Sequence, residues 1–166
     1  MPETNISSVI SIIGMTGTGK TTVGKILAEK LNYDFFDIDE IITQKTRKNP
    51  AEIFELYGEE TFRKIETEEL SHIFKNYNNK NFILSCGGGI VLKKENREML
   101  KKNSFVIWLL RPVEEIIKNG EILKRPPINN SVDNYIKIFK ERESLYAEIC
   151  DLKIEYTDFF KSCREY

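Results

Sequence analysis

The sequence has few of the residues on which many metal sites and hydrolase sites are built. His72 is the only histidine in 166 residues, which argues against a histidine-based metal site and against a Ser-His-Asp triad. The three cysteines, Cys86, Cys150 and Cys163, lie far apart, and no two of them have CxxC spacing. We therefore expect reduced thiols, which are typical of the cytoplasm, and a cytoplasmic protein.

The sequence also lacks an excess of charge of one sign and any long apolar run. Lysine and arginine together number 25 and aspartate and glutamate 26, so that the net charge is −1 and gives no sign of a nucleic acid partner. The polar start MPETNISS is followed only by the five-residue run VISII, which predicts neither a signal peptide nor a membrane span. The length favours one domain, 1–166.

Short apolar runs alternate with helical patterns along the chain. The runs at 9–13, 35–38, 82–86, 105–110 and 151–156 predict strands, and helices are predicted at 21–31, 50–57, 59–77, about 94–102, 113–118 and 132–149. This alternation predicts an α/β fold with a parallel sheet and helices on both of its faces. In such sheets, ligands bind beyond the carboxyl ends of the strands.

The segment GMTGTGKT at 14–21 has the pattern G-x-x-x-x-G-K-[ST] and stands between an apolar strand and an amphipathic helix. Its glycines allow backbone N–H groups to point at a phosphate, and the helix N-terminus adds a favourable dipole. Lys20 can reach the outer phosphates of a nucleotide, and the Thr21 hydroxyl suits Mg²⁺. A nucleoside triphosphate with magnesium is the ligand that this segment predicts.

An acidic pair, Asp37 and Asp39, follows the second predicted strand. In extended geometry, both carboxylates project from the same face. One carboxylate can hold a metal, and the other can accept a proton from an attacking hydroxyl. Alternatively, Asp39 caps the next helix, and the pattern alone leaves both readings open.

Two arginines occupy unusual positions on their helices. Arg142 lies on the apolar stripe of its helix between Phe139 and Tyr146, and Arg63 lies at the edge of another stripe. An arginine that faces inward needs a carboxylate or a phosphate, which suggests an acidic second substrate. Alternatively, each arginine is structural, and for Arg63 this would be an ordinary ion pair with Glu66, one turn along the helix.

Two further segments carry an open interpretation. The three consecutive glycines at 87–89 form either a tight turn or the wall of a pocket that a ligand approaches closely. The segment NGEILKRPPINNS at 119–131 is polar, basic and stiffened by two prolines. It is either a plain surface loop or a lid that closes over phosphates.

Together these motifs resemble the shikimate kinase family. The resemblance extends from the first strand to about residue 156 and rests on GMTGTGKT, the DID pair, GEETFRKIE, LSCGGG, KRPPI and KERESLY, in this order. It implies a P-loop kinase fold of the nucleoside-monophosphate-kinase type, a three-layer α/β/α arrangement with a five-stranded parallel sheet and a mobile lid. It further implies a substrate-binding region at 34–76, a lid at 118–132, and ATP-dependent phosphorylation of the 3-hydroxyl of shikimate with Mg²⁺. Small-molecule partners only and a monomer are expected.

The resemblance also implies roles for individual residues. Lys20, Asp39 and Arg125 would be catalytic, with Asp39 as the candidate base and Arg125 as the cation of the lid. Thr21 and Asp37 would serve the metal, the latter through water. The residues implied to bind shikimate are Asp39, Phe54, Phe62, Arg63, Glu66, Gly87, Gly88, Gly89 and Arg142. Those implied to bind ATP are Gly14, Met15, Thr16, Gly17, Thr18, Gly19, Lys20, Thr21, Thr22, Lys118 and Arg125.

Two other functions compete with this one. A kinase for another small hydroxy acid, of the gluconate kinase type, is not expected to combine the DID pair, FRKIE, the three glycines and Arg142. A binding module without catalytic activity would not need Lys20, Asp39 and Arg125 together.

Overall fold

The computed structural model describes residues 9–118, 128 and 131–155. The predicted lid therefore lies largely outside the described residues, as do its cation Arg125 and the prolines Pro126 and Pro127. The elements in chain order are β1 Val9–Ile13, α1 Lys20–Leu31, β2 Asp34–Asp37, α2 Ile38–Thr46, α3 Pro50–Asn76, β3 Phe82–Ser85, the 3₁₀ turn η1 Ile90–Leu92, α4 Lys94–Asn103, β4 Phe105–Leu110, α5 Val113–Ile117, α6 Val132–Ile149 and β5 Leu152–Glu155.

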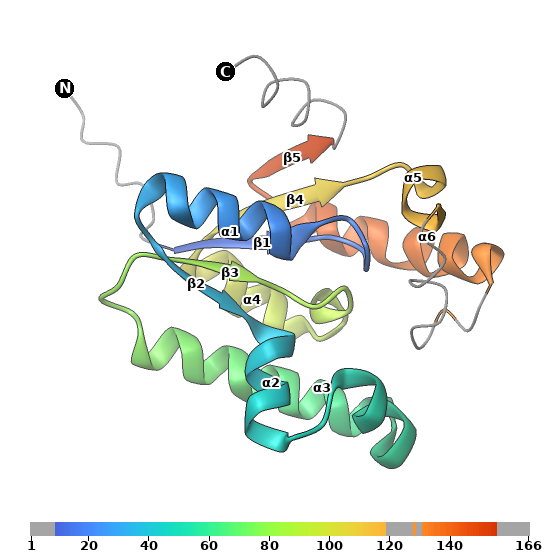
Figure 1. Ribbon diagram of the computed structural model, residues 1–166, viewed down its shortest axis with the longest axis horizontal. Coiled ribbons are helices and arrows are strands. Elements are labelled where there is room, and N and C mark those ends of the chain that lie inside the picture. Colours follow the sequence, from blue (N-terminus) through green and yellow to red (C-terminus); the bar gives the residue numbers. More distant parts are fainter. Residues whose placement is uncertain (1–8, 119–127, 129–130, 156–166) are drawn as a thin grey trace.

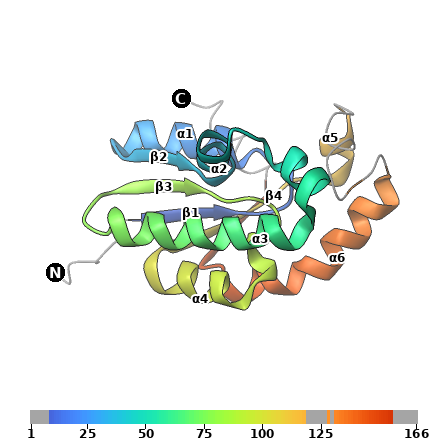
Figure 2. The same cartoon turned by 90° about the horizontal axis from the view of Figure 1, so that it is seen from below.

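The five strands form one parallel sheet in the order β2-β3-β1-β4-β5 (Figure 1). The central strands are apolar on both faces, because helices cover both sides. Helix α1 packs on the face that carries Ile10, Ile12 and Ile83. Helices α3, α4 and α6 lie on the opposite face, over residues such as Leu84 and Trp108 (Figure 2). The predicted α/β fold with a five-stranded parallel sheet is confirmed.

Three local features differ from the expectation. The second strand ends at Asp37, and the chain turns at once into α2, a helix that the sequence pattern did not predict. Leu31, which the spacing from Val23 and Leu27 predicts on the apolar face of helix 21–31, is exposed instead. Gly58 has the non-helical angles φ 81° and ψ 165° inside α3, so that the predicted stop after residue 57 is present as a sharp break in a longer element.

Candidate active site

The segment 14–19 forms a loop between β1 and α1 at the carboxyl edge of the sheet. A side chain at Gly14 would collide with the carbonyl oxygen of Leu109 on β4, so that only glycine fits against this strand. Gly19 has φ 92°, a conformation that glycine adopts readily, and directly precedes the first turn of α1. The loop therefore has the backbone that the phosphate-binding motif requires.

The Lys20 side chain folds back into this loop. It is buried, and its Nζ donates a hydrogen bond to the carbonyl oxygen of Met15 at 2.8 Å. The Thr18 hydroxyl donates to the same carbonyl at 3.0 Å. An ammonium group is thus placed inside a loop of backbone amides, which is an arrangement suited to the terminal phosphates of a nucleotide.

Beside this loop, oxygen atoms from three elements come together. The Thr21 hydroxyl donates a hydrogen bond to Asp37 Oδ2 at 2.6 Å, and Thr21 Oγ1 lies 3.4 Å from Ser85 Oγ at the end of β3. Mg²⁺ prefers oxygen ligands and keeps several waters and phosphate oxygens, so that two or three protein oxygens are a suitable donor set. The described residues contain no group of three or more His, Cys, Asp or Glu that could hold a metal ion by themselves.

The acidic pair does not have the predicted geometry. The two carboxylates were expected side by side on an extended strand, but Asp37 is the N-cap of α2 and Asp39 lies in its first turn. Asp37 Oδ1 accepts hydrogen bonds from the backbone N–H groups of Asp39 at 3.0 Å and of Glu40 at 3.3 Å. The expectation that Asp39 caps the helix is therefore wrong, since Asp37 does so. The helical turn directs Asp39 into a separate pocket.

This second pocket, which we call the acceptor pocket, has a volume of about 90 Å³. It combines one wall of the phosphate loop, three glycines and a set of charged side chains. Its lining residues are Thr16, Asp39, Pro50, Ala51, Phe54, Phe62, Arg63, Glu66, Gly87, Gly88, Gly89 and Arg142. All nine residues that the sequence assigned to the second substrate are among them.

Arg63 is buried in the acceptor pocket between two carboxylates and two aromatic rings. Its Nη1 donates to Glu66 Oε2 at 2.8 Å, and its Nη2 lies 3.2 Å from Glu59 Oε1. The guanidinium carbon lies 5.1 Å from the centre of the Phe62 ring and 5.5 Å from that of Phe54. The ion pair with Glu66, which was the alternative to a substrate-binding role, is present, and it holds the arginine in the pocket.

Glu66 is completely buried. Burial raises the pKa of its carboxyl group, and the neighbouring Arg63 charge partly offsets this effect. Within the described part of the chain, Glu66 Oε1 has no hydrogen-bond partner. This oxygen lies 2.8 Å from the position that a Cβ atom on Gly87 would occupy, so that the glycine leaves room for the carboxylate.

Arg142 projects inward from α6, as its place on the apolar stripe predicted. Only 7% of its surface is exposed, and its Nη1 donates to the carbonyl oxygen of Gly88 at 3.1 Å. The guanidinium group therefore lies at the back of the glycine turn and lines the acceptor pocket together with Arg63. Two buried arginines in one small pocket favour an anionic ligand.

Two residues predicted for the nucleotide lie apart from these pockets. Lys118 is exposed after α5 and forms an ion pair with Glu115. Thr22 is exposed in the first turn of α1. Neither lines the acceptor pocket or the cavity described next.

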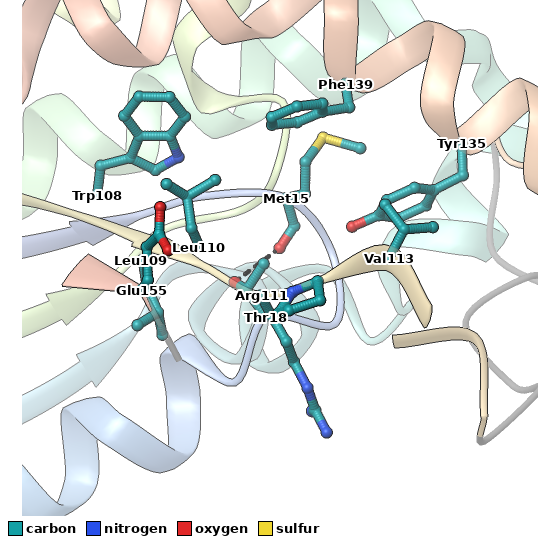
Figure 3. A pocket seen from close by; sticks show the side chains of 11 residues that line it. Met15, Thr18, Trp108, Leu109, Leu110, Arg111, Val113, Tyr135, Phe139 and Glu155 are labelled. Carbon is teal, nitrogen blue, oxygen red and sulfur yellow. Dashed lines mark hydrogen bonds between the residues drawn. The ribbon is translucent and has the colours of Figure 1, made fainter. Parts of the chain in front are cut away.

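A larger cavity, of about 290 Å³, also borders the phosphate loop (Figure 3). Met15 and Thr18 contribute to it from the loop, and its other lining residues are Trp108, Leu109, Leu110, Arg111, Pro112, Val113, Tyr135, Phe139 and Glu155. This lining is mainly apolar, whereas the smaller acceptor pocket holds the acid and the two arginines. Phosphoryl transfer needs charged groups more than apolar volume, so that the acceptor pocket is the better candidate for chemistry.

Several residues of this region were not predicted from the sequence. Thr16 was assigned to the nucleotide alone, yet it also lines the acceptor pocket. Ser85 could have been found, because it is the last residue of a buried strand at the ligand-binding edge. Tyr135 and Tyr146 both lie on the apolar stripe of helix 132–149, which gave no sign that their hydroxyl groups hydrogen-bond the two loops. Among the described residues, no helix is long and apolar enough to cross a membrane.

Comparisons with known proteins agree with the geometry. A family model described as shikimate kinase matches residues 16–162. The chain is 43% identical over 141 residues to a shikimate kinase of Clostridium botulinum (strain Eklund 17B / Type B), a match that covers 85% of this chain and 83% of that protein. It is 38% identical over 152 residues to a shikimate kinase of Dictyoglomus turgidum, with coverage of 89% and 87%.

Two solved structures with a similar arrangement are shikimate kinases. The shikimate kinase from Acinetobacter baumannii in complex with shikimate is similar with a TM-score of 0.82 and 35% sequence identity, over 91% of this chain and 84% of that one. The shikimate kinase from Aquifex aeolicus is similar with a TM-score of 0.72 and 29% identity, over 89% and 85% of the two chains.

Proposed function

The chain belongs to the shikimate kinase family, and we propose that its phosphate loop and its acceptor pocket bind the two substrates of that family's reaction. The protein transfers a phosphoryl group from ATP to the 3-hydroxyl of shikimate, which gives shikimate 3-phosphate and ADP, a step toward the aromatic amino acids. The observation that supports the residue assignment best is the acceptor pocket, where Asp39, Arg63 and Arg142 meet against the phosphate loop.

The acceptor pocket supplies recognition and deprotonation. Arg63 and Arg142 bind the shikimate carboxylate and neighbouring hydroxyls through charge-assisted hydrogen bonds. Asp39 hydrogen-bonds the 3-hydroxyl and accepts its proton as the oxygen attacks phosphorus. Phe54, Phe62 and the glycines 87–89 form the walls against the ring, and Glu66 holds Arg63 in place. A relative solved in complex with shikimate supports this choice of ligand. Residues 34–76 supply most of the lining and form the substrate-binding region.

The phosphate loop supplies the donor site. Backbone N–H groups of residues 14–19 bind the β- and γ-phosphates of ATP. Lys20 neutralises the negative charge of the phosphoryl group while it is transferred. Thr22 and Lys118 contact the nucleotide outside the loop, and Arg125 is the lid cation, within 118–132, that serves the ATP phosphates. Positioning and charge neutralisation account for the catalysis, because phosphoryl transfer needs little covalent help from the protein.

Magnesium fits the oxygen atoms beside the loop. Thr21 would hold the ion through its hydroxyl and Asp37 would hold it through water. The ion would neutralise phosphate charge and orient the phosphates of ATP. Asp37 serves this purpose while its other oxygen caps α2, which fixes the carboxylate in one orientation. We further propose that the protein acts as a monomer in the cytoplasm.

A coupled assay of ADP release tests the proposal. With ATP and Mg²⁺, we expect turnover that depends on shikimate and none with gluconate. Turnover with gluconate alone would replace the substrate assignment by the gluconate kinase alternative. Nucleotide binding without turnover on either acceptor would support the binding module instead.

A further inference from the structure

Helix α6 contacts both glycine loops of the active site with polar groups. Tyr135, Arg142 and Tyr146 are seven and four residues apart and so lie on one face of the helix. The Tyr135 hydroxyl donates a hydrogen bond to the carbonyl oxygen of Thr16 in the phosphate loop at 3.0 Å. Figure 3 shows this hydroxyl directed toward the loop, beside Met15.

The other end of the same face holds the glycine turn. The Tyr146 hydroxyl donates to the carbonyl oxygen of Gly88, and Arg142 Nη1 donates to the same oxygen at 3.1 Å. Tyr146 Oη also lies 3.6 Å from the sulfur of Met15, and its ring stacks on Trp108 with centroids 5.6 Å apart. One helix therefore binds the backbone of the donor loop and of the acceptor turn.

The two carbonyls belong to residues that contact each other. A Cβ atom on Gly88 would lie 2.9 Å from Thr16 Oγ1 and 3.0 Å from the Thr16 backbone nitrogen. The donor loop and the acceptor turn thus meet at Thr16 and Gly88, and any shift of one against the other changes the separation of the two substrates.

Both tyrosines keep their protons under ordinary conditions. Burial raises the pKa of Tyr146 to about 12 and also raises the pKa of Tyr135. Their side chains are almost fully buried, which holds both hydroxyls in place against the two carbonyls. Both groups are therefore fixed hydrogen-bond donors.

We propose that Tyr135 and Tyr146 are positioning residues that set the distance and angle between the donor phosphate and the acceptor hydroxyl. The two hydrogen bonds brace the Thr16–Gly88 contact, and each hydroxyl donates to a backbone carbonyl of one loop. The inference rests on the proposed function, because it assumes that the phosphate loop holds the donor and the glycine turn the acceptor. In-line transfer depends strongly on such alignment, since a misplacement of about 1 Å can lower the rate by about 10²-fold.

The variants Tyr135→Phe and Tyr146→Phe test the proposal, since each removes one hydroxyl and keeps the ring. We expect the single-turnover rate of phosphoryl transfer, at saturating ATP and shikimate, to fall by about 10- to 100-fold in each variant. The dissociation constants of ADP and of shikimate, measured separately by calorimetry, should change by less than about threefold, because the contacts with the ligands remain. The double variant should lose less than the product of the two single losses, as expected for groups that brace one contact.

Tyr33→Phe is the matched control, because Tyr33 is half-buried against the cluster under α1, on the other face of the sheet. Its transfer rate should equal that of the wild type. The proposal would be overturned if the two α6 variants had unchanged transfer rates and only lower melting temperatures. Both tyrosines would then contribute to the stability of the core alone. Weaker binding with an unchanged transfer rate would also overturn the proposal.

The wild-type assay separates this inference from the proposed function. If the wild type uses an acceptor other than shikimate, the substrate assignment fails, and the rates of the variants are compared with the wild type on that acceptor. The ratio of the transfer rate of each variant to that of the wild type then decides the role of the tyrosines, whichever acceptor the protein uses.

Discussion

Asp37 and Asp39 are two residues apart and have separate surroundings. Asp37 accepts bonds from Thr21 and from the first N–H groups of α2, whereas Asp39 lines the acceptor pocket. The start of α2 between them directs one carboxylate to the metal side and the other to the acceptor. This separation allows the two acids to be tested independently.

Asp39→Asn keeps the size of the side chain and removes its ability to accept a proton. We expect kcat with shikimate to fall by about 10²-fold or more, because general-base catalysis typically contributes about 10²–10⁴-fold. The affinity for ADP, measured by calorimetry, should stay near that of the wild type. Glu40→Gln, the exposed neighbour on α2, serves as the control. A kcat that stays within threefold would remove the assignment of Asp39 as the base.

Gly88 and Gly89 differ in what a side chain there would meet. A Cβ atom on Gly89 would collide with the Arg63 guanidinium, whereas on Gly88 it would press on Thr16 of the phosphate loop. The backbone of Gly89, with φ −102°, would accept any residue, so that only Arg63 stands in the way.

Gly89→Ala should therefore act on the acceptor alone. We expect the KM for shikimate to rise about tenfold or more, since a charge-assisted hydrogen bond contributes about 1.5–3 kcal/mol. The KM for ATP should stay unchanged. In Gly88→Ala, by contrast, both constants should rise, because Thr16 belongs to the donor loop. Equal effects on the two substrates in Gly89→Ala would argue for a general disturbance of the turn.

At the scale of elements, the strands and helices with strong apolar patterns were predictable. Strands 9–13 and 105–110 and helix 132–149 have the bounds that the sequence indicates, because each has a clear apolar pattern. Helix α2 was not predictable from periodicity. Its start depends on the hydrogen bonds of the Asp37 side chain, and Phe35 to Ile38 read equally well as a strand.

The site was predictable to the extent that it consists of local motifs. The phosphate loop and the inward Arg142 follow from patterns of a few residues. The bonds from Tyr135 to Thr16 and from Tyr146 to Gly88 join residues 119 and 58 positions apart. A tyrosine on an apolar stripe has the same pattern whether or not its hydroxyl is used, so that only the tertiary structure reveals these bonds.

Gly58 is the residue that breaks α3 between Phe54 and Phe62, which line the acceptor pocket. Its angles, φ 81° and ψ 165°, belong to a region that is almost exclusive to glycine, and a Cβ atom there would meet no other atom within 4 Å. Gly58→Ala therefore introduces backbone strain without a steric collision. We expect the free energy of unfolding to fall by about 1–3 kcal/mol in urea denaturation. An unchanged or higher stability would show that the break is not strained for other residues.

At the scale of the whole molecule, the sheet core holds a thiol that can report on unfolding. Cys86 lies directly after β3 with 2% of its surface exposed, and burial raises the pKa of its thiol well above the usual range. Since the thiolate is the reactive form, alkylation at pH 8 requires opening of the core. Cys150 is only half-buried and should react first.

A variant with Cys150→Ser and Cys163→Ser leaves Cys86 as the only thiol, and its alkylation by iodoacetamide can be followed by mass spectrometry. We expect a rate that is at least about 10³-fold slower than in urea, because opening of the core costs several kcal/mol. ATP with Mg²⁺ and shikimate should slow the reaction further, since ligands that bind only the folded state stabilise it by about 2.7 kcal/mol at 100 times Kd. Fast labelling of Cys86 in the folded protein would contradict this expectation and would mean that the carboxyl edge of β3 opens locally. Slower labelling in the presence of the ligands would then show that ligand binding in the acceptor pocket suppresses this local opening.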